Sequence, residues 1–200
     1  MRRLLLLIPL VLGACGDDDD DDQVSETTTS TTVDDTTTSS TADDETTTTS
    51  TSTATTVFDG ATTPTSIAGD GSGLLTEVRV GAEGDLERVV FEFRDELPGA
   101  MVEYVDPPIT QDASGEEIAV AGSAFLQVVM MPATGYDFEA DAESYTGPDR
   151  VTGDTTVVQE VVRTGDFEGY LTWVIGLDRE VPFRVLTLDD GRLVVELSAG

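Results

Sequence analysis

The clearest structural signal in the sequence is the stretch Leu171-Thr172-Trp173-Val174-Ile175-Gly176-Leu177. Its largest apolar residues stand at every second position. Because successive side chains of a β-strand point to opposite faces, this alternation predicts a strand with one face buried in a core. The same repeat occurs over residues 74–80, 89–93 and 193–197. The sequence therefore predicts at least four strands.

Five shorter stretches are further strand candidates, because β-branched and apolar residues in them are bounded by Gly, Pro or Asp. They are residues 100–105, 118–121, 125–131, 155–163 and 183–188. No stretch of twelve residues has the spacing of an amphipathic helix. About nine short strands joined by polar turns predict an all-β fold. An antiparallel β-sandwich is expected, because two apolar sheet faces then cover each other.

Individual segments indicate how the strands are arranged. Residues 125–131 are apolar on both faces, which favours a central place in a sheet. Asp189-Asp190-Gly191 predicts a hairpin connection, so the last two strands should pair antiparallel. Residues 132–152 lack strand alternation and are interpreted as a long excursion from the sandwich.

The N-terminus has the architecture of an export signal. Two arginines follow Met1, residues 4–12 are apolar, and Leu12-Gly13-Ala14-Cys15 is a small-residue cleavage site. Nine apolar residues form a helix of about 14 Å, which is less than half of the ~30 Å hydrocarbon core of a bilayer. Residues 1–14 are therefore predicted to be a signal peptide that is removed.

The cleavage site resembles the lipobox of bacterial lipoproteins. That resemblance implies a diacylglyceryl group, with palmitate-type chains, on the sulfur of Cys15, and cleavage just before this residue. The protein would then be anchored in the cell membrane on its extracytoplasmic face. The alternative is an ordinary secretory signal that leaves Cys15 as a free thiol. Because Cys15 is the only cysteine, an intramolecular disulfide is excluded.

A disordered linker is expected over residues 15–73, ahead of a folded domain at 74–200. Residues 16–73 contain no basic side chain, residues 17–22 are all Asp, and 27 of the 44 residues in 23–66 are Ser or Thr. Such a composition cannot bury a core. As a flexible chain it would span about 40 to 45 Å. Its hydroxyl groups are candidate sites for O-linked sugars.

The charge and composition exclude several classes of function. The formal net charge is −30, which disfavours nucleic acid and anionic lipid as partners. All ten basic residues are Arg, and His is absent. Without His, Lys or a second Cys, the usual bases for a Ser or Cys nucleophile and the imidazole ligands of catalytic zinc are missing. No cofactor is expected. Glycoside hydrolysis by paired carboxylates remains an alternative.

Acidic side chains provide one set of candidate site residues. Asp137, Glu139, Asp141 and Glu143 stand at every second position, so an extended chain would place them on one side. Hard oxygen ligands of this kind suit calcium, although the spacing of an EF-hand is missing. The alternative is that like charges on a strand edge prevent aggregation.

A second set surrounds the stretch Gly165-Asp166-Phe167-Glu168-Gly169. Asp166 and Glu168 could belong to a ligand-binding loop, but glycines flanking polar residues before a strand are also typical of a tight turn. Trp173 and Tyr170 fall on opposite faces of their strand. Trp173 is therefore predicted to be in the core, and Tyr170 to be an exposed aromatic on which a sugar could stack.

The C-terminal part resembles the AMIN-like domain of actinobacterial lipoproteins, a family distantly related to the N-terminal domain of cell-wall amidases. The residues that carry the resemblance lie at 87–93, 102–105, 122–128, 165–169, 173–177, 182–185 and 192–197, with Glu196 where the family would have Asp. The resemblance implies a non-catalytic β-sandwich in the cell envelope that binds peptidoglycan or an envelope protein. A structural module without a ligand is the alternative.

Overall fold

The computed structural model describes residues 58–200. In this range the chain forms strands and loops, and none of it forms a helix that could cross a membrane. All but one of the strand pairings are antiparallel, the exception being a short parallel contact between β2 and β6. The predicted all-β, mainly antiparallel fold is therefore confirmed.

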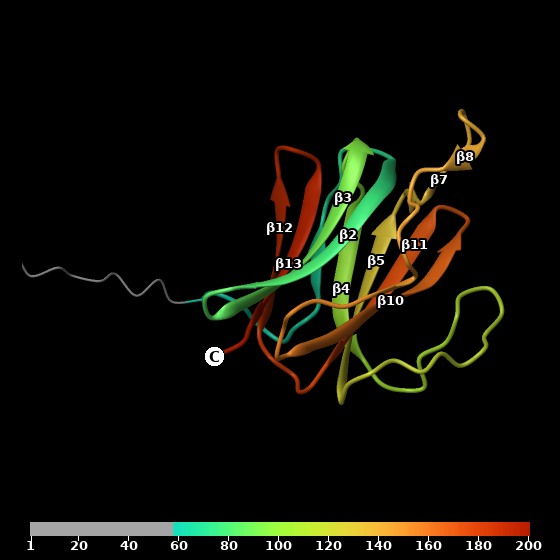
Figure 1. Cartoon of the computed structure of the whole chain (residues 1–200). Coiled ribbons are helices and arrows are strands. Elements are labelled where there is room, and N and C mark those ends of the chain that lie inside the picture. The colour runs from blue at the N-terminus through green and yellow to red at the C-terminus, as the bar shows by residue number, and fades with distance from the viewer. Residues whose placement is uncertain (1–57) are drawn as a thin grey trace, which may run out of the picture. The chain divides into compact units, whose positions relative to one another are not determined.

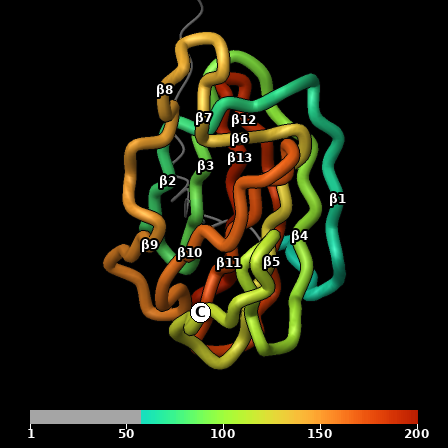
Figure 2. Tube along the Cα trace, turned by 90° about the vertical axis from the view of Figure 1, so that its right-hand side faces the viewer, coloured from blue at the N-terminus to red at the C-terminus, as the bar shows by residue number. Residues whose placement is uncertain are grey.

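The strands form two main sheets and one small hairpin (Figure 1). The first sheet has the order β1 (Thr65–Ile67), β4 (Gly99–Val105), β5 (Ala124–Met131), β11 (Tyr170–Leu177), β10 (Val158–Phe167) and β9 (Arg150–Val151). The second has the order β12 (Phe183–Leu188), β13 (Arg192–Ser198), β3 (Leu86–Asp95), β2 (Gly73–Glu83) and β6 (Ala133–Thr134). The hairpin pairs β7 (Tyr136–Asp137) with β8 (Ala142–Glu143). Figure 2 shows β1 beside β4 and, on the other side of the molecule, β9 beside β10.

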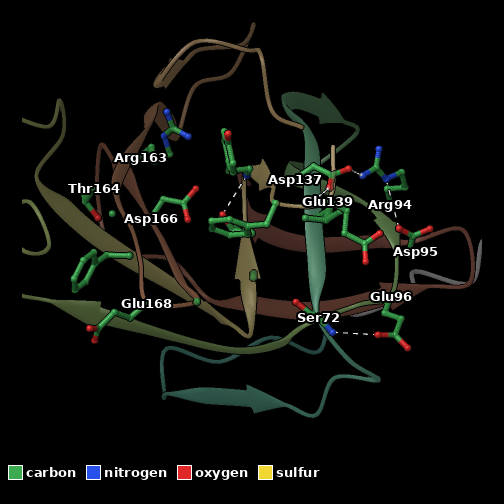
Figure 3. A pocket seen from close by; sticks show the side chains of 18 of the residues that line it. Ser72, Arg94, Asp95, Glu96, Asp137, Glu139, Arg163, Thr164, Asp166 and Glu168 are labelled. Atoms are coloured by element: carbon green, nitrogen blue, oxygen red, sulfur yellow. Dashed lines mark hydrogen bonds and ion pairs between the residues drawn. The ribbon is translucent and has the colours of Figure 1, made fainter. Parts of the chain in front are cut away.

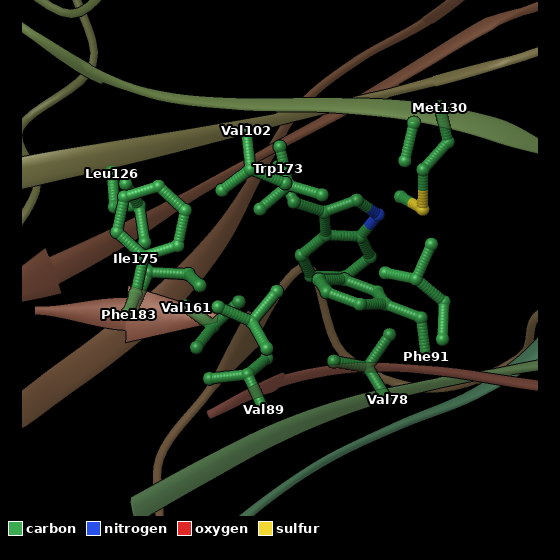
Figure 4. Packing of buried hydrophobic residues seen from close by; sticks show 14 of the residues in the cluster. Val78, Val89, Phe91, Val102, Leu126, Met130, Val161, Trp173, Ile175 and Phe183 are labelled. Atoms are coloured by element: carbon green, nitrogen blue, oxygen red, sulfur yellow. The ribbon is translucent and has the colours of Figure 1, made fainter. Parts of the chain in front are cut away.

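The core lies between the two sheets and is centred on Trp173 (Figure 4). This side chain is fully buried on β11, as predicted. Its ring meets the edge of Phe91 from β3 in the facing sheet, with ring centroids 6.0 Å apart and planes at 61°. Edge-to-face contacts of this kind add about 0.5–1.5 kcal/mol to the burial of the rings. The two sheets therefore pack face to face around an aromatic pair.

Most of the predicted strands are present. The four with the clearest alternation correspond to β2, β3, β11 and β13, and residues 183–188 form β12. Residues 125–131 belong to β5, which lies in the interior of its sheet between β4 and β11 as expected. The predicted hairpin at Asp189-Asp190-Gly191 joins β12 to β13, with Gly191 at a φ of 80°.

The strand predicted at residues 118–121 is wrong. Its backbone groups are satisfied outside any sheet: the amide of Ile118 donates to the carbonyl of Ile109 at 2.8 Å, and that of Ala121 to the carboxylate of Glu160 at 2.5 Å. The carbonyl oxygen of Ala121 also lies close against Gly176 of β11. The segment therefore crosses the outer face of the first sheet instead of joining its edge.

Residues 61–67, which the sequence predicts to belong to the linker, take part in the fold. β1 pairs with β4, and Ala61 exchanges backbone hydrogen bonds of 3.0 and 2.9 Å with Phe183 of β12. Ile67 packs against the core. A polar composition hides this strand, because backbone pairing to a free sheet edge needs few apolar side chains. The signal peptide, Cys15 and the linker as far as residue 57 lie outside the described residues.

Residues 132–152 are not a separate excursion but pair with both sheets and pack against the core. β6 pairs with β2, β9 pairs with β10, and Tyr145 is buried in the core with its ring 5.6 Å from that of Trp173. Only the β7–β8 hairpin projects from the end of the sandwich (Figure 1). The prediction of an excursion is wrong because the pairing strands β6 and β9 are two residues long, too short for an alternation to be visible in the sequence.

Candidate functional site

A pocket of about 990 Å³ opens at the end of the sandwich where the β7–β8 hairpin projects. Most of its lining comes from three parts of the chain: residues 163–169 around the β10–β11 turn, residues 133–139 leading into and through β7, and the chain at the start of β2 and the end of β3. Gln111 and Asp149 complete the lining. Figure 3 shows Arg163, Asp166 and Glu168 on one side of the pocket, with Asp137 and Glu139 on the other. The structure thus brings four of the predicted candidate residues, Asp137, Glu139, Asp166 and Glu168, into one cavity.

A two-residue turn positions Glu168 at the pocket. Phe167 pairs with Tyr170 across it, and the central residues Glu168 and Gly169 have φ values of 52° and 80°. Positive φ at both positions is the type I′ geometry, whose twist matches that of the flanking strands. The tight turn predicted here is confirmed. Gly165 lies outside it, at an irregularity of β10 that packs closely against Asp112.

Asp166 connects the β10–β11 turn to the segment before β7. Its carboxylate accepts the backbone N–H of Gly135 at 2.8 Å. Nearby, Arg163 forms an ion pair with Asp149 at 2.5 Å and lies 5.6 Å from the ring centroid of Tyr145. Burial raises the pKa of the Tyr145 hydroxyl. These contacts hold one wall of the pocket to the core.

Asp137 holds the opposite wall. It accepts the backbone N–H groups of Glu139 and Ala140, both at 3.0 Å, and it forms an ion pair with Arg94 of β3. The hydrogen bond from Ala140, followed by the guanidinium of Arg94, holds the pKa of Asp137 below its usual value. Asp137 is therefore a fixed anion that docks the hairpin on the second sheet.

The four carboxylates proposed for calcium do not share one side, because the chain turns at residues 138–141. Asp137 and Glu139 line the pocket, whereas Asp141, with a φ of 52°, accepts the hydroxyl of Tyr136, and Glu143 is exposed on β8. In the part of the chain that the structure describes, no group of three or more acidic side chains is placed to hold a metal ion. The expectation of an extended acidic edge is wrong.

Exposed aromatic rings stand beside these carboxylates. Phe138 is 79% exposed and Phe167 is 53% exposed, and both line the pocket. Tyr170 is exposed as predicted, but it lies outside the pocket lining, at the start of β11. Nothing in the sequence marks Phe138 or Phe167 as a site residue. The exposure of their rings is what indicates a site. The alternation of apolar residues cannot predict that exposure within a turn.

The pocket carries an excess of negative charge. Seven carboxylates and two guanidinium groups line it: Asp95, Glu96, Asp137, Glu139, Asp149, Asp166, Glu168, Arg94 and Arg163. Both arginines are already in ion pairs with carboxylates. Within residues 58–200, the side chains of Glu139 and Glu168 make no hydrogen bond or ion pair. The pocket can therefore accept hydrogen bonds and attract cations, and it disfavours anions.

Comparison with known proteins agrees with this architecture. No curated protein matches the chain. A family model for the AMIN-like domain matches residues 73–199, which is well over half of the chain and includes both main sheets from β2 onward. The resemblance inferred from the sequence is thereby confirmed, and the chain belongs to the AMIN-like domain family.

Proposed function

We propose that this protein is a cell-envelope lipoprotein. In this proposal a lipid on Cys15 holds it on the extracytoplasmic face of the membrane, and its folded domain binds peptidoglycan non-catalytically through the pocket between the β10–β11 turn and the β7–β8 hairpin.

Family membership supports the location and the general role. The AMIN-like domain is a cell-envelope, peptidoglycan-related module, and such domains are generally non-catalytic. The sequence of residues 1–15 supports lipid anchoring, since it combines a basic start, a short apolar stretch and a cysteine after small residues. A stalk of Ser, Thr and Asp would let the domain reach beyond the bilayer.

The pocket is the single observation that supports a ligand. Binding sites are concave, and they combine exposed aromatic surface with a few polar groups that fix orientation. Phe138 and Phe167 provide the aromatic surface. Glu139 and Glu168 are free to accept hydrogen bonds from hydroxyl, amide or ammonium groups. Peptidoglycan offers all three kinds of donor.

Co-sedimentation with purified peptidoglycan tests the binding. The full chain should pellet with the polymer, and a Phe138→Ala, Phe167→Ala double variant should pellet less. A Met101→Ala variant is the matched control, because Met101 is also a partly exposed apolar residue but lies on β4 and does not line the pocket. Equal pelleting of all three proteins would contradict a role for the pocket. Failure of the unmodified chain to pellet would contradict peptidoglycan binding.

The same assay separates binding from hydrolysis. A carboxylate-dependent glycosidase would release soluble fragments from the polymer, whereas a binding module leaves it intact. Such an enzyme needs one carboxyl group that stays protonated as the general acid. Asp137 does not suit that role, because its hydrogen bonds and Arg94 lower its pKa. We expect no release of soluble sugar.

Mass spectrometry of the native protein tests the anchor. The N-terminal peptide should begin at Cys15 and carry the mass of a diacylglyceryl group. Cys15→Ser should abolish the modification and release the protein from the membrane fraction. An unmodified thiol at Cys15, or wild-type protein free in the medium, would contradict anchoring.

A further inference from the structure

The charge of the pocket indicates more about its ligand than the family does. Residues 58–200 carry 28 acidic side chains and eight arginines, and all eight arginines form ion pairs with carboxylates. The chain contains no Lys. Within residues 58–200, every positively charged side chain is therefore already paired with a carboxylate. None is left to bind an anionic part of a ligand, such as a phosphate or a peptide carboxylate.

The groups left free in the pocket favour a cation. Glu139 and Glu168 approach it from different walls, one after β7 and the other in the β10–β11 turn (Figure 3). Phe138 and Phe167 each neighbour one of these residues in the chain and expose their rings in the same pocket. Carboxylates attract an ammonium group by charge, and the faces of aromatic rings attract it through their quadrupole.

The fixed groups keep this arrangement in place. Asp137 and Asp166 each accept backbone N–H groups through one oxygen, and the other oxygen of Asp137 is paired with Arg94. They hold the two walls of the pocket, whereas the carboxylates of Glu139 and Glu168 have no partner within residues 58–200. The cavity, its exposed rings and its unmatched charge are thus separate properties that suit one class of ligand.

We propose that the pocket recognises a primary ammonium group, and that in peptidoglycan this group is the free amine of a diamino acid in the wall peptide. This inference rests on the proposed binding of peptidoglycan and specifies which part of the polymer is bound. The sugar backbone carries no ammonium group, and it would lie outside the pocket.

Titration of the full ¹⁵N-labelled chain with N-acetyl-lysine methylamide tests the chemistry. Saturable amide shifts are expected at Glu139, Glu168 and Gly169, and they should be absent with the same compound acetylated on its side-chain nitrogen. Because shifts are read residue by residue, binding of amines to the acidic stretch at 17–22 does not confuse the result. Equal shifts with the acetylated compound would overturn the proposal.

Charge-matched variants provide the control. Glu139→Gln with Glu168→Gln should raise the Kd for the lysine compound about tenfold, as expected for the loss of two exposed ion contacts. Glu117→Gln with Glu180→Gln removes the same charge from exposed positions outside the pocket and should leave the Kd unchanged. Equal Kd values for the two double variants would overturn the ammonium site.

Peptidoglycan with acetylated amines distinguishes this inference from the proposed function. Loss of co-sedimentation after acetylation supports both. Equal co-sedimentation of native and acetylated polymer overturns the ammonium proposal and leaves peptidoglycan binding intact. If the chain co-sediments with neither form of the polymer, the proposal of peptidoglycan binding is overturned. The lysine titration alone then decides whether the pocket binds an ammonium group.

Discussion

The carboxylate of Glu87 accepts the backbone N–H of Val158 at 2.7 Å, which joins β3 of one sheet to the start of β10 in the other. The same carboxylate accepts the N–H groups of Val157 and Thr156 at 3.0 and 2.5 Å, and the hydroxyl of Thr156 at 2.9 Å. Glu87 is 1% exposed. One buried carboxylate therefore accepts hydrogen bonds from three successive backbone N–H groups.

Replacing this carboxylate should destabilise the domain. In Glu87→Gln one acceptor oxygen becomes an NH₂ group that faces backbone N–H donors, so at least one buried donor loses its partner. We expect the free energy of unfolding to fall by about 1–3 kcal/mol. Urea denaturation followed by Trp173 fluorescence measures it. Glu117→Gln, at an exposed position, is the control and should change stability by less than about 0.5 kcal/mol.

The stability contributed by Glu87 should depend on pH. Burial by itself raises the pKa of this carboxyl, but the hydrogen bonds from Val158, Val157 and Thr156 outweigh it and hold the pKa below the ordinary value. A lowered folded-state pKa means that the contribution is complete above the unfolded pKa of about 4.3 and is lost as the pH falls through the folded value. The stability difference between wild type and Glu87→Gln should therefore shrink below about pH 4. A difference that grows on acidification would refute the lowered pKa.

Substitutions at Tyr145 test whether residues 132–152 belong to the core. Its ring packs edge-on against Trp173 at 88°, and its hydroxyl donates to the carbonyl of Pro148 at 2.7 Å. Tyr145→Phe removes only the hydrogen bond and should cost about 1 kcal/mol. Tyr145→Ala also leaves a cavity beside Trp173 and should cost about 3–5 kcal/mol. Thermal or urea unfolding measures both, and equal small effects would show that the segment is peripheral.

The turn that presents Glu168 depends on the backbone of Gly169. This residue has a φ of 80°, and a Cβ atom built there would meet no other atom within 4 Å. The cost of Gly169→Ala is therefore conformational and should be about 1–2 kcal/mol. Gly81→Ala is the matched control, because that position also has free space and its φ is not positive. Equal stability of the two variants would argue against the type I′ turn.

Sequence reasoning predicted the parts of the fold that local patterns encode. Alternation over residues 171–177 and 193–197 is repeated often enough to specify a strand and its buried face. Residues 118–121 have similar composition, but whether a stretch pairs depends on a neighbouring strand that the sequence does not reveal. Tyr145 is one aromatic residue among polar ones, so no alternation of apolar residues predicts that it lies in the core.

The site was predicted only in part for the same reason. Asp166 and Glu168 stood out because glycines flank them. The ion pair between Arg94 and Asp137 joins residues 43 positions apart, and only the folded chain brings them together. Glu87 looks like any other strand glutamate in the sequence, because neither its burial nor its backbone donors leave a local signal.

Backbone amide shifts of the ¹⁵N-labelled chain during titration with soluble peptidoglycan fragments test the role of the pocket most directly. We predict saturable shifts confined to the pocket, at Phe138, Glu139, Glu168 and Gly169, with none at strands β12 and β13, which contribute no residue to its lining. Shifts that cluster on β12 and β13, or no saturable shift at any fragment concentration, would contradict peptidoglycan binding in this pocket.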